Sequence, residues 1–198
     1  MIDINELLKI LQENPAVKNL CDGKNELGNL SLSEEALLLA SWFMKQPQTL
    51  IVVKNNSYTA QRLYERIQPL LHEKALLFVM EESLRVQSIA SSPEDREGMI
   101  YALTKIVRSD ESMLVLIVNT ADFMRYLPSP ALFAKHCFHL HTDEEIEYEV
   151  LKQRLQNSGY TKVSRVDQPL CYAARGGIID VYSMNYEYPL RIEFFDNI

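Results

Sequence analysis

The chain has 198 residues, of which 47% are hydrophobic and 24% are charged, and this composition excludes an intrinsically disordered protein. The net charge of −7, with dispersed lysines and arginines, disfavours autonomous DNA binding, because neutralising phosphates requires clustered cations. The sequence has three cysteines without CxxC spacing, no signal-peptide pattern at its start, and no apolar run near the roughly 18 residues of a membrane span, so we expect a reduced, cytoplasmic protein without membrane contact.

The first part of the chain alternates helical patterns with continuous apolar runs. A first helix is predicted around residues 7–11 and ends near Pro15, and a second helix follows Ser33. The later predicted elements are a strand at 49–54, a helix at 57–71, a strand at 75–79, a helix from Pro93 to about Val107 and a strand at 113–118. Apolar strands that alternate with helices predict an α/β fold with a parallel sheet covered on both faces.

The pattern changes at a boundary within residues 126–141, around the turn LPSP. Thr142 and Glu145 form a predicted capping box for a helix. Short β segments follow at 161–166, 170–174, 177–184 and 188–195. We therefore predict an α/β domain at 1–126, whose sheet is incomplete, followed at 127–198 by a small α+β domain made of an antiparallel sheet and one helix.

One cluster of potential metal ligands lies in the segment KHCFHLHT and consists of His136, Cys137, His139 and His141. A zinc site needs about four ligands that converge in a closed geometry. The alternation of this segment predicts a strand, which would point neighbouring side chains to opposite faces. We therefore predict that the chain holds no metal here.

An α/β unit of this kind invites a search for a phosphate-binding loop of the pattern GxxxxGK[ST]. The pair Gly23-Lys24 lacks the upstream glycine. The better-placed segment is NLSLSEEA, which opens a helix, and its four required positions hold Asn29, Glu34, Glu35 and Ala36. Two carboxylates at a helix N-terminus suit the helix dipole and would repel a triphosphate. A capped helix is predicted in place of a nucleotide site.

Other catalytic patterns are missing from the sequence. The strand at 113–118 runs into Val118 and Asn119 without an acidic pair that could hold magnesium. No GxSxG, HExxH or EF-hand pattern occurs. We therefore expect no catalytic residues and no cofactor.

The end of the chain carries the most specific motifs, which are Gly159-Tyr160, YAARGGIIDVY at 172–182 and PLRIEFFD at 189–196. In order and spacing they resemble the UvrB-homology region shared by the excision-repair helicase UvrB and the bacterial transcription-repair coupling factors (Mfd). A looser likeness upstream extends the resemblance to most of residues 26–198. UvrB keeps the phosphate-binding loop and a long aromatic hairpin, whereas residues 80–92 here are short and lack aromatics. Both departures favour the N-terminal UvrB-homology region of Mfd.

The resemblance implies a degenerate P-loop, helicase-like first domain and a second domain that binds the repair protein UvrA. In the family, two arginines and the second phenylalanine of the shared motif contact UvrA, which implies Arg175, Arg191 and Phe195 here. Strand alternation independently places Arg191 and Phe195 on one face. Arg175 joins this face if the strands pair in parallel or if the chain folds back at Gly176.

The residue pattern leaves a second interpretation of the same positions open. Arg175 and Arg191 could be cross-strand partners of Glu193 and Asp180, with Phe195 at the edge of the core. In that case the three residues would hold the sheet together and would bind no partner.

Two functions from different classes follow. The first is a non-catalytic, UvrA-recruiting module that links stalled RNA polymerase to nucleotide excision repair. RNA polymerase and DNA would then be bound by other parts of a longer, ATP-driven parent protein. The alternative is the N-terminal nucleotide-binding fragment of a UvrB-like excision-repair helicase. The slot at 29–36 discriminates between them, because the alternative requires it to bind a nucleotide.

Overall fold

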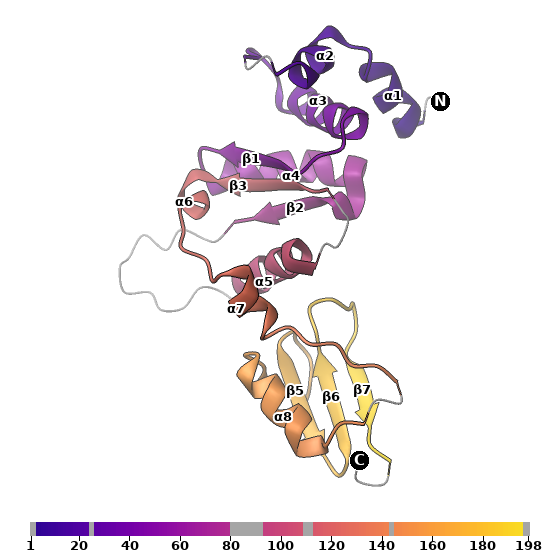
Figure 1. Cartoon of the computed structure of the whole chain (residues 1–198), viewed down its shortest axis with the longest axis vertical. Helices are drawn as coiled ribbons and strands as arrows, with labels where there is room; N and C mark the ends of the chain where they lie inside the picture. The colour runs from indigo at the N-terminus through magenta and orange to yellow at the C-terminus, as the bar shows by residue number, and fades with distance from the viewer. Residues whose placement is uncertain (1–2, 24–25, 80–92, 109–112, 143–144, 196–198) are drawn as a thin grey trace. The chain divides into compact units, whose positions relative to one another are not determined.

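The computed structural model describes residues 3–23, 26–79, 93–108, 113–142 and 145–195 (Figure 1). The chain divides into two compact units, of which the first is Met1–Ala102 with Arg108–Tyr126 and the second is Leu103–Val107 with Leu127–Ile198. The segment 80–92, which distinguishes the chain from UvrB in the sequence, lies outside the described residues. Within the described ranges, no helix is both long enough and apolar enough to cross a membrane.

The first unit is built on three parallel strands in the order β1-β3-β2 (Figure 1). Each strand is a short apolar run: β1 (Leu50–Lys54), β2 (Ala75–Phe78) and β3 (Val115–Asn119). Both pairings of the central strand β3 are parallel. Parallel neighbours need a long crossover between them, and helices supply it here. The predicted α/β character and the parallel sheet are confirmed.

Helices surround this sheet. The helical elements up to residue 123 are α1 (Ile4–Leu11), α2 (Pro15–Cys21), α3 (Leu32–Lys45), α4 (Ser57–Leu71), the short 3-10 helix η1 (His72–Lys74), α5 (Pro93–Arg108) and α6 (Thr120–Phe123). Helix α4 packs against all three strands, α3 packs against α4, and both α1 and α2 pack against α3. The core between them includes Leu8, Leu63, Ile67 and Ile117, all without solvent exposure.

Helix α3 begins two residues earlier than the sequence predicts, at Leu32 in place of Glu34. Its N-cap is Ser31, whose hydroxyl accepts from Glu34 N at 3.3 Å while the Glu34 carboxylate accepts from Ser31 N at 2.8 Å. Ser33 therefore lies inside the helix, and the expectation that the helix follows it is wrong. A capping box needs two hydrogen bonds between the N-cap residue and the residue three positions later. Of the two serines, only Ser31 has a glutamate at that position.

The second unit packs a helix on a four-stranded sheet of order β4-β5-β6-β7. Its elements are α7 (Pro130–Ala134), α8 (Tyr148–Asn157), β4 (Thr161–Lys162), β5 (Cys171–Arg175), β6 (Ile178–Tyr182) and β7 (Leu190–Glu193). Helix α8 covers one face of the sheet, where Leu151 and Leu155 pack with Tyr172, Ile179 and Val181 (Figure 1). The predicted combination of one main helix and a small sheet is thus found.

Two local predictions for this unit are wrong. The sheet is not entirely antiparallel, because β4 pairs in parallel with β5 and ends at Lys162. Helix α8 begins at Tyr148, and the proposed capping box of Thr142 and Glu145 does not open it. Ile146 explains the later start, since it lies in the non-helical segment before α8 and packs against the core of the unit.

Candidate functional site

A two-glycine turn folds β5 back onto β6. Gly176 and Gly177 have φ angles of +55° and +83°, a region that disfavours residues with a Cβ atom. Because a Cβ at Gly176 would meet open space, the backbone conformation rather than crowding requires glycine. The antiparallel register that results places Asp180 on β6 opposite Arg191 on β7. Of the two arrangements that the sequence left open for Arg175, the structure has the fold-back at Gly176.

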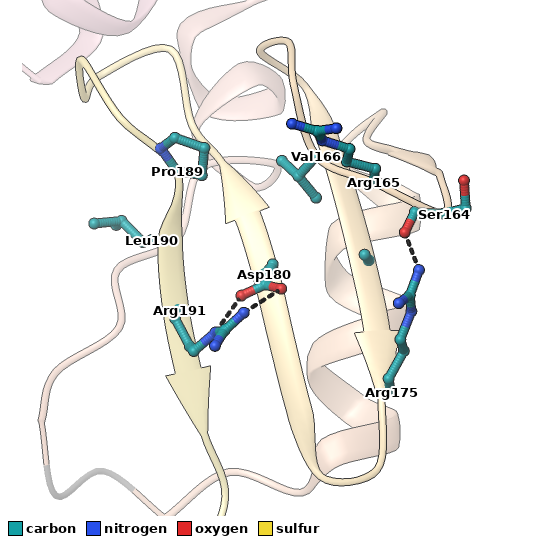
Figure 2. A pocket seen from close by; sticks show the side chains of 9 residues that line it. Ser164, Arg165, Val166, Arg175, Asp180, Pro189, Leu190 and Arg191 are labelled. Carbon is teal, nitrogen blue, oxygen red and sulfur yellow. Dashed lines mark hydrogen bonds and ion pairs between the residues drawn. The ribbon is translucent and has the colours of Figure 1, made fainter.

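The sheet has one covered face and one open face, as strand alternation requires. Ile179 and Val181 point to the covered face and are buried, and Ile192 packs against the same core. The other face, here called the open face, carries Asp180 and Arg191. No helix of the second unit covers this face in Figure 2. It is therefore the surface of the sheet that a partner could reach.

A cross-strand ion pair lies on the open face. Arg191 donates from Nε to Asp180 Oδ1 at 2.7 Å and from Nη2 to Oδ2 at 3.0 Å. These hydrogen bonds lower the pKa of the Asp180 carboxyl, against a smaller opposing effect of burial, and they raise the pKa of Arg191. The cross-strand interpretation thus holds for Arg191. Its side chain is still 61% exposed, and a guanidinium with five donors retains N–H groups for a partner.

A shallow hollow on the open face brings two of the predicted residues together (Figure 2). The residues that line it are Ser164, Arg165, Val166, Ala173, Arg175, Asp180, Pro189, Leu190 and Arg191. Arg175 donates from Nη2 to the carbonyl oxygen of Ser164, and so it does not take the cross-strand role with Glu193. Arg175 and Arg191 therefore share one site, although different groups hold them.

One segment that lines the hollow, residues 164–166, was missed by sequence reasoning. The sequence predicts a strand at 161–166, but the strand ends at Lys162 and the following segment brings Arg165 and Val166 to the hollow. No local pattern signals this placement. A side-chain hydrogen bond to this segment comes from Arg175, which lies 11 residues away from its acceptor in the sequence.

Phe195 lies near the end of β7 and does not line the hollow. It is 78% exposed, which does not fit a place at the edge of the core. Its neighbour Phe194 points to the covered face, where its ring meets Tyr148 of α8 edge-on at 5.3 Å between centroids. The predicted strand at 188–195 ends at Glu193, so Phe195 lies in a bend just beyond it, and strand alternation does not assign its side chain to a face. A large exposed aromatic next to a sheet is typical of a residue that anchors an interface.

The chain's own groups fill the segment 29–36, where a phosphate-binding loop would lie. Glu34 caps α3, and its hydrogen bonds with Ser31 lower its pKa. Glu35 accepts from Lys54 Nζ with both carboxylate oxygens, at 2.8 and 2.9 Å. Ala36 is buried, and Asn29 adopts a positive φ of 58°. A lysine of β1 thus neutralises a carboxylate at the place where a phosphate-binding loop would present a free cation.

The polar side chains at the carboxyl end of β3 also bond to other groups of the chain. The fully buried Asn119 donates from Nδ2 to Ser57 Oγ at 3.0 Å and to Asp122 Oδ2 at 2.6 Å. The other oxygen of Asp122 accepts from Arg125 Nε at 2.6 Å. This network joins β3 to the first turns of α4 and α6. Its acidic group is committed to the fold.

The histidine-rich segment 136–141 is not a strand, which corrects the prediction. It continues from the end of α7, where His136 N donates to Phe133 O at 3.0 Å, and no strand pairs with it. The rings of His139 and His141 stack with centroids 6.3 Å apart. Within the part of the chain that the structure describes, no three histidine, cysteine or acidic side chains gather in a way that could hold a metal ion.

The Asp180–Arg191 pair predicts a pH dependence of stability. Because the carboxyl pKa is lower in the folded chain than its ordinary value of about 3.9, the pair stabilises the fold above that value. This stabilisation should disappear as the pH falls from about 4 through the lower folded pKa. Asp180→Asn should therefore be less stable than the native chain at pH 7, and the difference should narrow below pH 4.

Chemical denaturation of both proteins across this pH range measures the difference. Asp167→Asn is the matched control, because it exchanges an exposed carboxylate that has no ion-pair partner among the described residues. A constant gap between Asp180→Asn and the native chain from pH 7 to pH 3 would contradict the coupling.

Residues 138–198, which include the sheet with the open face, match the UvrB interaction domain family. Over most of its length the chain is also similar to transcription-repair-coupling factors. It is 25% identical to that of Bacillus subtilis over 200 residues, which cover 98% of this chain. It is 26% identical to those of Staphylococcus haemolyticus and Staphylococcus aureus over 168 residues, which cover 84% of this chain.

The chain spans only a small part of these relatives. The aligned region is 17% of the Bacillus subtilis protein and 14% of the two staphylococcal proteins. The resemblance to the N-terminal UvrB-homology region of transcription-repair coupling factors, predicted from the sequence, is confirmed by these matches.

Proposed function

We propose that this chain, which carries a UvrB interaction domain and is related over most of its length to transcription-repair-coupling factors, is a UvrA-recruiting module. It would link stalled RNA polymerase to nucleotide excision repair without catalysing a reaction itself. UvrA would bind the small α+β domain at 127–198. Arg175, Arg191 and Phe195 would form or support the binding surface.

The observation that carries this proposal is the open face of the second sheet. A sheet with one face packed and exposed arginines on the other, next to an exposed phenylalanine just beyond its last strand, is suited to binding a protein. Phe195 is 78% exposed, and Arg191 is 61% exposed in spite of its ion pair. The match to the UvrB interaction domain family covers this sheet, which supports the choice of UvrA as the partner.

We further propose that the first unit is a degenerate P-loop-like unit that no longer binds a nucleotide. The parallel sheet and the helix that opens at Ser31 support the likeness. Two observations support the loss of nucleotide binding. The Glu35 carboxylate at this helix start is paired with Lys54, and residues 26–31 form no strand leading into α3. The alternative, a nucleotide-binding fragment of a UvrB-like helicase, requires a free cation and a glycine-rich loop at this place.

Titration of the whole chain with purified UvrA, followed by calorimetry, tests the main proposal. We expect saturable binding at micromolar concentrations, and we expect unlabelled UvrB to compete for UvrA. Duplex DNA in place of UvrA should show no binding at physiological salt, because the chain has a net charge of −7 and its cations are dispersed. Absence of UvrA binding would refute the proposed function, and salt-sensitive DNA binding would refute the proposed division of roles.

ATP with magnesium should leave the melting temperature of the chain unchanged. A ligand that binds only the folded state at a hundred times its Kd adds about 2.7 kcal/mol of stability, which a melting curve readily detects. Magnesium alone is the matched control. A rise in melting temperature that grows with ATP concentration would favour the helicase alternative instead.

The remaining parts of the proposal concern a longer protein. The curated relatives are about six to seven times the length of the aligned region, since it covers 17% and 14% of them. We place RNA polymerase binding, DNA binding and ATP-driven movement along DNA in regions that this chain does not span. A cytoplasmic location follows from that role.

A further inference from the structure

The three arginines that line the hollow are held in different ways. Arg191 gives two N–H groups to Asp180, and Arg175 gives one to the carbonyl oxygen of Ser164. Arg165 is exposed, and among the described residues its guanidinium has neither a hydrogen-bond partner nor an ion-pair partner. It is therefore the cation of the hollow that is most available to an incoming group.

The hollow differs in charge from the chain around it. Three arginines and a single carboxylate, Asp180, line it, whereas the chain as a whole has a net charge of −7. The other walls include apolar side chains from Val166, Pro189 and Leu190. A carboxylate that stands beside an apolar side chain would complement both the local positive charge and the apolar wall.

Arg175 fixes the segment that presents Arg165. The segment is anchored at both ends, since Val163 N donates to Tyr172 O at 2.9 Å and Leu170 N donates to Tyr182 O at 2.8 Å. Between these anchors, the hydrogen bond from Arg175 Nη2 reaches the carbonyl of Ser164, directly before Arg165. Figure 2 shows this bond at one end of β5 and Arg165 with Val166 further along the same segment.

We propose that Arg165 is the anchor in this hollow for an aspartate or glutamate of UvrA that is flanked by an apolar residue, and that Arg175 acts as a positioning residue. Arg175 holds the segment 163–170 so that Arg165 and Val166 face the hollow. A guanidinium binds a carboxylate through two parallel hydrogen bonds, which makes the contact directional. This inference rests on the proposed function, because UvrA is the partner that it assumes.

A double-mutant cycle on the whole chain tests both roles by calorimetric titration with UvrA. Arg165→Ala should weaken binding about tenfold or more, the usual effect of losing an arginine anchor. The affinity of Arg165→Lys for UvrA should lie between those of the native chain and Arg165→Ala, because lysine keeps the charge but cannot form the two parallel hydrogen bonds. Arg175→Ala should also weaken binding, but the double variant should bind no more weakly than Arg165→Ala alone. Arg154→Ala, an exposed arginine on the helix that covers the other face, is the matched control.

Hydrogen exchange separates positioning from general unfolding. In Arg175→Ala, amides of residues 164–168 should exchange faster while those of β6 stay protected. Arg175→Lys should slow this exchange again in part, because it keeps a donor in reach of the Ser164 carbonyl. If the losses from Arg165→Ala and Arg175→Ala add fully, Arg175 makes its own contact and the positioning role is wrong.

The outcomes distinguish this inference from the proposed function. If Arg165→Ala binds UvrA like the native chain while Phe195→Ala binds weakly, the anchor is wrong and the proposed function stands. If the native chain does not bind UvrA at all, the proposed function fails, and the inference fails with it. Should Arg175→Ala unfold, Arg165→Ala and Arg165→Lys still decide the identity of the anchor, because Arg165 is exposed and has no hydrogen bond or ion pair among the described residues.

Discussion

Phe195→Ala and Arg191→Ala should each weaken the binding of UvrA about thirtyfold, because an aromatic or arginine anchor typically contributes ~2 kcal/mol or more to an interface. Both changes should leave the fold intact. The ring of Phe195 is 78% exposed, and the carboxylate that Arg191 would leave behind is 33% exposed, so water can solvate it. Calorimetric titration measures the loss of affinity, and a thermal melt followed by circular dichroism checks the fold.

Matched controls for this pair lie on the first unit. Tyr126 is fully exposed, and Arg66 is exposed on α4, so Tyr126→Ala and Arg66→Ala remove the same kinds of side chain away from the open face. Both should bind UvrA normally. Normal binding by the Phe195 and Arg191 variants would exclude the open face as the site. Unfolding of these variants would favour the purely structural interpretation that the sequence had left open.

Asp122→Ala should lower the free energy of unfolding of the first unit by about 1–3 kcal/mol, the usual cost of leaving a buried hydrogen-bond donor without its acceptor. The Asp122 side chain is 1% exposed. Its loss removes one of the two acceptors of the buried Asn119 amide, which keeps its hydrogen bond to Ser57. The guanidinium of Arg125 also loses its acceptor, but it is 42% exposed and water can solvate it. Urea denaturation followed by tryptophan fluorescence reports on this unit, because Trp42 is the single tryptophan and packs against its core.

The matched control for this prediction is Asp22→Ala. Asp22 is exposed after the last turn of α2, so its removal should shift the midpoint of unfolding only slightly. If Asp122→Ala unfolds at the same urea concentration as the native chain, the network contributes little. The carboxylate would then be free for another role at the end of β3.

The first unit could be predicted well because its strands are buried apolar runs. LIVVK, ALLF and VLIVN are readable without any long-range information, since each is bounded by helical patterns. The first residues of helices α3 and α8 were harder to predict. The start of α3 depends on which serine has a glutamate three residues later, and the start of α8 depends on Ile146 reaching the core in a non-helical segment. The second of these is decided by tertiary packing and is invisible to a local pattern.

The candidate site was predictable to the extent that it follows from alternation. Period-two alternation places Arg191 on the open face and Ile192 on the covered face, as the structure has them. The pairing of Arg191 with Asp180 was one of two readings that the pattern allowed. Arg165 could not be predicted, because the segment that carries it leaves the sheet after β4 and is held by a hydrogen bond from Arg175. A local sequence pattern cannot predict a side-chain hydrogen bond of this kind.

The turn at Gly176 and Gly177 also sets how the second unit tolerates a change of length. With these two glycines between β5 and β6, Ala174 stands opposite Ile179. One inserted residue that slid β6 by a single position would turn Asp180 toward α8 and Ile179 toward solvent, because adjacent residues of a strand point to opposite sides. A substitution in this hairpin alters one side chain, whereas an insertion would exchange the two surfaces of the strand. The number of residues in this turn therefore determines which side chains form the open face, whatever the identity of those residues.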